Sequence, residues 1–95
     1  MGVPTLLPSF VTTLIKGGSM IFVKVQAPAG RNIYVGGDYD NSKGLAPLTI
    51  ILEAGTHTFE TVFSKAVDFR AQVQDVPDGT NLKIALDPVS PPEPI

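Results

Sequence analysis

The sequence has no cysteine, no tryptophan and only one histidine among its 95 residues. Without cysteine, the chain can form no disulfide and no thiolate metal site. A single histidine is too few for a zinc site when no cysteine is present to share the metal. The lack of cysteine fits the cytosol, but a disulfide-free surface domain or a virion protein would have the same composition.

The sequence also has no large excess of charge of either sign. It contains seven Lys and Arg and nine Asp and Glu, so its net charge is −2. This balance gives no electrostatic reason to expect nucleic acid or an anionic membrane as a partner. No segment is long and apolar enough to be expected to span a bilayer. The first residues lack Lys or Arg before their apolar part, are interrupted by Pro4 and Pro8, and are followed by Lys16, so we expect no secretory signal there.

Nine glycines and nine prolines predict many turns and few long helices in a single small domain. Between the turns, apolar and polar residues alternate at a period of two. Six such runs predict an all-β fold, a small antiparallel β-sandwich of about six or seven strands. The runs occupy residues 20–26, 31–36, 48–53, 56–63, 67–74 and 81–86.

Two details of this pattern make specific predictions. The alternation places Phe59 and Phe63 on the same face of one strand. The stretch "EAGT", residues 53–56, is a turn signal between two runs and predicts a short hairpin.

The two ends of the chain differ from its middle. We predict an apolar arm or linker at residues 1–19, the sandwich at residues 20–87 and a Pro-rich tail at residues 88–95. With four prolines in eight residues, the tail is expected to be extended or disordered and unable to pair in a sheet. The apolar part of the arm fits a helix or a strand, and "KGGS" at residues 16–19 is typical of a flexible joint. Its apolar residues are Leu6, Leu7, Phe10, Val11, Leu14 and Ile15.

Burying even half of these apolar side chains is worth several kcal/mol, at roughly 25 cal/mol per Å². The arm is therefore expected to be covered, either on its own sandwich or on a neighbouring chain as a docked arm or donated strand.

Short motifs with Gly and Pro punctuate the middle of the chain, at residues 28–30, 33–37, 44–48 and 55–59. Over roughly residues 23–86 their order resembles the PEGA domain, a small β-sandwich module. Arg31 stands where that family usually has Ala, Gly37 where Asp is common, and the loop at 38–44 is longer than typical. The resemblance implies a non-catalytic module of cell-surface, envelope or extracellular proteins, and it transfers no catalytic residue to this chain.

Asp38, Asp40 and Ser42 have the spacing that begins a calcium-binding loop. An EF-hand loop needs Gly at position 6 and a bidentate Glu at position 12, where this chain has Lys43 and Thr49. The flanking runs also predict strands rather than helices. We therefore interpret the stretch as a connecting loop, and its first three polar residues are only a weak metal candidate.

His57 would need a nucleophile and an orienting acid to act as a catalytic base. Ser64 and Asp68 are present, but no nucleophile motif surrounds Ser64. Since His57 shares the predicted face of Phe59, we expect partial burial and a structural hydrogen bond. No enzyme activity and no cofactor are predicted.

The predicted function is a non-catalytic structural or protein-interaction module that assembles with protein partners or with itself, forming a homo-oligomer through the arm. A small virion protein, such as a phage capsid-decoration or tail component, is an alternative. A carbohydrate-binding surface module is another, with Tyr34 and Tyr39 as its aromatic candidates. Stacking of nucleic acid on these tyrosines, beside Arg31 and Lys43, lacks the clustered positive charge it needs. The expected location is the cell envelope, the extracellular surface or a virion rather than the cytoplasm.

Overall fold

A computed structural model describes residues 19–95, so the predicted arm lies outside the described residues except for its last residue, Ser19. The described chain contains seven strands and no helix. It therefore contains no helix that is long and apolar enough to cross a membrane. The strands are β1 (Met20–Ala27), β2 (Tyr34–Val35), β3 (Leu48–Glu53), β4 (Gly55–Phe63), β5 (Ala66–Val76), β6 (Asn81–Ala85) and β7 (Asp87–Pro94).

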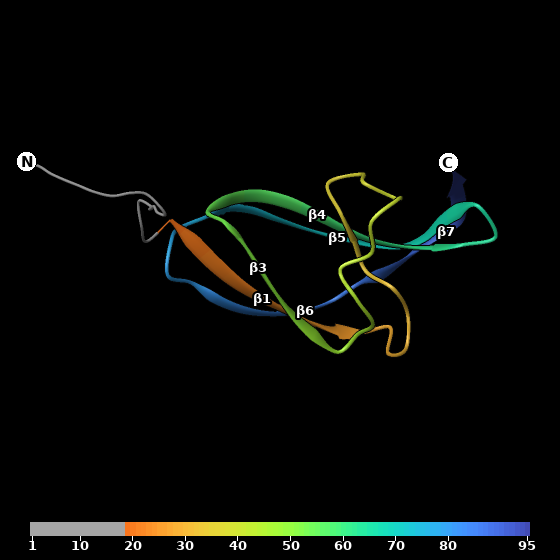
Figure 1. Cartoon of the computed structure of the whole chain (residues 1–95). Helices are drawn as coiled ribbons and strands as arrows, with labels where there is room; N and C mark the ends of the chain where they lie inside the picture. Colours follow the sequence, from red (N-terminus) through yellow and green to blue (C-terminus); the bar gives the residue numbers. More distant parts are fainter. Residues whose placement is uncertain (1–18) are drawn as a thin grey trace, which may run out of the picture.

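The seven strands form two sheets that face each other (Figure 1). One sheet has three strands in the order β3-β1-β6, and the other has four in the order β2-β4-β5-β7. The all-β, two-sheet sandwich predicted from the alternation is thus confirmed. In Figure 1 the long β4–β5 hairpin extends past the three-stranded sheet, at the end of the molecule opposite the start of β1.

The core lies between the sheets and follows the period-two pattern. β1 buries Ile21, Val23 and Val25 completely, while the residues between them face outward. Phe59 of β4 is the largest fully buried side chain and packs from the opposite sheet. Because alternate residues of a strand point to opposite faces, each strand gives one row to the core and one row to the outside.

Phe63 does not join this core, although it was predicted to share a face with Phe59. Its side chain is 68% exposed, whereas that of Phe59 is fully buried. Phe63 is the last residue of β4, and the β4–β5 ladder shifts register just before it, between Thr61 and Val62. Alternation assigns a face, but it does not tell where along a strand the opposite sheet ends.

The prediction that residues 88–95 cannot pair in a sheet is wrong. β7 pairs antiparallel with β5, from Ala66 opposite Pro94 to Arg70 opposite Asp87. The amide of Ile95 adds a hydrogen bond to the carbonyl of Lys65, at 3.0 Å. β7 is an edge strand. Proline is tolerated in an edge strand because the side without an N–H can face solvent, where no neighbouring strand needs a donor. The Pro-rich tail is extended, but it belongs to the sheet.

Two connections also differ from the expectation. The stretch "EAGT" does not close a hairpin, because β3 and β4 belong to different sheets. It is a corner at which the chain passes from one layer to the other. The turn after β5 crosses back in the same way, and it brings β6 beside β1 in parallel, so one pair of this sandwich is not antiparallel.

Candidate functional site

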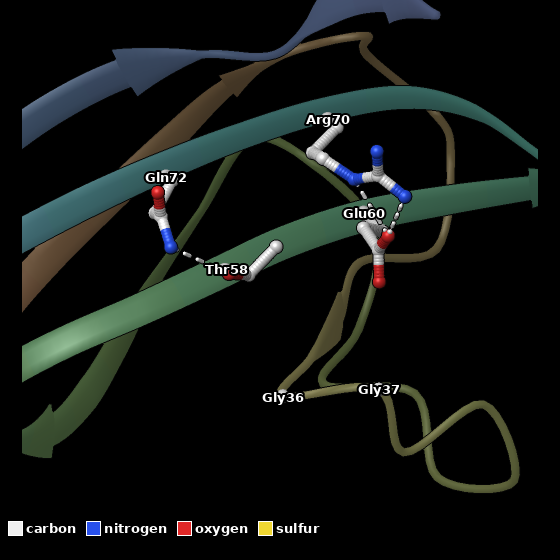
Figure 2. A pocket seen from close by; sticks show the side chains of 6 residues that line it. All are labelled: Gly36, Gly37, Thr58, Glu60, Arg70 and Gln72. Atoms are coloured by element: carbon white, nitrogen blue, oxygen red, sulfur yellow. Dashed lines mark hydrogen bonds and ion pairs between the residues drawn. The ribbon is translucent and has the colours of Figure 1, made fainter.

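A shallow hollow of about 490 Å³ lies on the outer face of the four-stranded sheet. β4 and β5 supply its polar rows, because Thr58 is directly opposite Gln72 and Glu60 is directly opposite Arg70 (Figure 2). The chain leaving β2 closes the third side with backbone only, at Gly36 and Gly37. Both glycines have positive φ, 68° and 77°, a conformation that residues with a Cβ seldom adopt.

Glu60 lies in this hollow with a side chain that is only 5% exposed. Its Oε1 accepts a hydrogen bond from the Tyr39 hydroxyl at 2.7 Å, and its Oε2 accepts one from Arg70 Nε at 2.8 Å. Arg70 also forms an ion pair with it, at 2.7 Å between Nη2 and Oε2. A buried carboxylate is tolerated when charge and hydrogen bonds compensate its lost hydration, and here two residues do so.

Arg70 joins three strands of the sheet. Besides Glu60 on β4, its guanidinium binds both carboxylate oxygens of Glu93 on β7, at 3.1 and 2.7 Å. The hydrogen bonds to Glu93, and to a smaller extent those to Glu60, raise the pKa of Arg70. The contact between Arg70 and Glu93 also lowers the pKa of Glu93. The hydrogen bond to Glu60, with some burial, raises the pKa of Tyr39. We call Tyr39, Glu60, Arg70 and Glu93 the polar clamp.

A second polar cluster lies where the β4–β5 register shifts. Asp68, the extra residue of β5 there, accepts hydrogen bonds from Thr61 Oγ1 at 2.6 Å and from Arg31 Nη2 at 3.1 Å. Arg31 also donates to the Val62 carbonyl and lies 5.7 Å from the centre of the Phe63 ring. Burial alone raises the pKa of Asp68, but the bonds from Thr61 and Arg31 and the charge of Arg31 outweigh it, so the pKa is lowered.

Both clusters consist of groups that already bind one another. Each carboxylate oxygen of Glu60 has a donor, and the Arg70 guanidinium is shared between two acids. Such an arrangement ties neighbouring strands together and leaves these polar groups engaged within the chain. Sequence reasoning missed the clamp, although Glu60 and Arg70 both lie on the outward rows, since only the strand register makes them opposite.

The loop with the calcium-like spacing uses its polar groups to shape the turn. Both oxygens of Asp38 accept from Asn41 Nδ2, at 3.2 and 3.1 Å, and Oδ1 also accepts from the amide of Asp40. Ser42 donates to Asn32 and accepts from the Gly44 amide. These are the local bonds of a connecting loop. Within residues 19–95, no three His, Cys, Asp or Glu side chains are grouped to hold a metal ion.

His57, Ser64 and Asp68 are not brought together. His57 lies near the start of β4 and Ser64 just past its end, seven residues or roughly 23 Å apart along the strand. His57 is partly buried, and its Nε2 forms a hydrogen bond with the Glu53 carbonyl at 2.7 Å, as the sequence predicted. Asp68 is bound to Thr61 and Arg31 instead.

Tyr34 and Tyr39 do meet, with ring centres 6.1 Å apart and planes at 65°. This edge-to-face pair packs the 36–44 loop against β2 and is not a flat platform for a sugar ring. The Tyr39 hydroxyl is also occupied by Glu60.

The outer face of the three-stranded sheet is different in kind. Phe22 of β1 and Ile51 of β3 are directly opposite each other there, 36% and 57% exposed, and Met20 beside them is 38% exposed. A hollow of about 470 Å³ adjoins them, lined by Phe22, Lys24, Thr49, Asn81, Leu82 and Lys83. We call Met20, Phe22 and Ile51 the apolar row.

Comparison of the chain with protein-family models, with curated proteins and with solved structures finds no match. The PEGA resemblance therefore stays a prediction. The structure is a small two-sheet sandwich that has ion pairs on one outer face and an exposed apolar row on the other.

Proposed function

We propose that this chain is a non-catalytic structural module that assembles with other proteins, copies of itself included, through apolar surface. The observation that carries the proposal is the apolar row on the outer face of the three-stranded sheet. When a partner covers apolar side chains that lie side by side on a sheet face, their burial stabilises the complex by roughly 25 cal/mol per Å².

The polar groups support the same function. Glu60, Asp68 and Arg70 stabilise the sandwich by binding one another and the strands around them. A rigid sandwich with its acids and bases engaged internally suits a scaffold better than an enzyme, which needs groups poised to exchange protons with a substrate. The setting we propose is the cell envelope or an extracellular surface, in line with the PEGA resemblance, with a virion as the alternative.

Sedimentation velocity of the full chain over a range of concentrations tests self-assembly. We expect the sedimentation coefficient to rise with concentration, and we expect Ile51→Glu on the apolar row to remove that rise. Gln74→Glu is the control, because Gln74 is exposed on β5 of the other sheet. A full chain that stays monomeric at every concentration would contradict assembly with itself.

A further inference from the structure

We infer that the apolar row is the acceptor site for the N-terminal segment, residues 6–15, of a second copy of this chain. The inference rests on the proposed function and deepens it by naming both sides of the contact. It is carried by the geometry of the three-stranded sheet and by the position at which the N-terminal segment joins it.

The acceptor side is a row that runs across two strands. Ile51 on the edge strand β3 is directly opposite Phe22 on the central strand β1, and Met20 lies two residues before Phe22 on the same face. Lys24, two residues after Phe22 on β1, and Lys83, opposite it on β6, border the row. Their hydrocarbon stems extend the apolar surface while the ammonium groups stay in water.

The segment has the matching chemistry. Residues 1–15 contain no charged side chain, and the six apolar residues of the predicted arm lie between positions 6 and 15. Ten extended residues span roughly 33 Å, while Met20 and Lys24 are roughly 13 Å apart along β1. One segment is therefore long enough to cover the whole row.

The position of the junction favours a second copy over the chain's own segment. The Ser19 carbonyl accepts a hydrogen bond from the Ala54 amide, so the β1–β3 pairing holds the chain in the sheet up to Ser19. A chain that reverses tightly next to a strand forms a hairpin, and its returning strand lies in the same sheet beside the first. Both sides of β1 are already taken, by β3 and β6. A segment from another copy reaches the face without any reversal, and the exchange gives each chain one donor and one acceptor.

Mixing two full-length variants tests this. The donor-blocked variant carries Phe10→Asp with Leu14→Asp, and the acceptor-blocked variant carries Phe22→Glu with Ile51→Glu. Added negative charge on both sides prevents a new attraction between the two altered surfaces. Thermal melting checks that each variant folds, and Ile51→Ser replaces the double glutamate variant if that one does not.

We expect each variant alone to associate at least tenfold more weakly than the full chain, and the mixture to form a one-to-one complex by light scattering. Gln74→Glu should associate like the unaltered chain. If the acceptor-blocked variant is monomeric but the donor-blocked variant associates as well as the full chain, the inference is wrong while the proposed function stands. If the acceptor-blocked variant associates as well as the full chain, the apolar row is not the interface and both are wrong. If the mixture stays monomeric, the segment does not dock on a second copy. If the full chain is monomeric throughout, both self-assembly and the inference are overturned.

Discussion

The two outer faces of this sandwich are built from the same strand pattern but are occupied differently. On the four-stranded sheet, Glu60 and Arg70 lie opposite each other and close the face with ion pairs. On the three-stranded sheet, the equivalent cross-strand pair is Phe22 and Ile51, and both remain exposed. Side chains that lie directly opposite each other stabilise a sheet as pairs. Glu60 and Arg70 bind each other within the chain, whereas Phe22 and Ile51 remain open to a partner.

The difference separates stability from association. The polar clamp ties β4, β5 and β7 together, so its loss should be measured as a loss of folded protein. The apolar row contributes little to the fold of a single chain, so its loss should be measured in assembly. Variants of matched size on the two faces test this contrast.

The largest effect is expected for Arg70→Met. This change leaves the buried Glu60 carboxylate without its cation, and we expect the free energy of unfolding to fall by about 2–3 kcal/mol, somewhat less than for a fully buried pair because Arg70 is partly exposed. Lys24→Met on the other face should change it by no more than about 0.5 kcal/mol. Urea unfolding of both variants measures the difference, and equal losses would remove the distinction between the faces.

Acidification should weaken the polar side through Asp68. Its pKa is lowered in the folded chain, so the unfolded state binds more protons at acidic pH, and stability is lost as pH falls through the folded pKa. Glu93, whose pKa is lowered by Arg70, adds to the same direction. We expect the melting temperature to decline below about pH 5.

The matched variants for this pH profile are Asp68→Asn and Asp78→Asn. Asp68→Asn should flatten the decline, because the group that gains protons on unfolding is gone. Asp78 is exposed in the turn before β6, and its replacement should leave the decline in place. A profile that Asp68→Asn does not alter would show that the hydrogen bonds from Thr61 and Arg31 have no part in acid stability.

A smaller effect is expected for Tyr39→Phe. The change removes one hydrogen bond to Glu60 and keeps the edge-to-face contact with Tyr34. We expect a loss of about 1 kcal/mol in the free energy of unfolding, the usual value for a hydrogen bond, or slightly more because the acceptor is charged. Tyr34→Phe keeps the bond to Glu60 and should cost less. The reverse order in urea unfolding would mean that the loop is held by the Tyr34 hydroxyl instead.

The sequence was sufficient for what depends on one strand at a time. The alternation in β1, and in β5 from Phe69 to Gln74, correctly separated inward from outward residues. These predictions succeed because period two is a property of the extended backbone itself. The partial burial and hydrogen bond of His57 were obtained in the same way. The alternation failed at Val67, because the register shift at Asp68 puts Val67 opposite Val62 instead of in line with Phe69.

Features that depend on how two strands pair could not be predicted from the sequence. The β4–β5 turn has positive φ at both Ser64 and Lys65, where Asn-Gly would have signalled a hairpin, so the sequence gives no sign of it. The prolines of β7 argued against pairing, because edge position is not visible in a sequence. The contact between Arg70 and Glu93 joins residues 23 positions apart and exists only once β7 has paired with β5.

The smallest effect is expected for calcium at the 38–44 loop. Asp38 spends both oxygens on Asn41 and the amide of Asp40, and position 12 of the pattern is Thr49 rather than a bidentate glutamate. Replacing these turn bonds by a cation with six to eight oxygen ligands would require ligands that this stretch does not supply. Titration calorimetry should therefore give no binding heat with calcium, and Asp38→Ala should give the same trace as the unaltered chain. A micromolar calcium constant that disappears in Asp38→Ala would show that the loop rearranges around a metal.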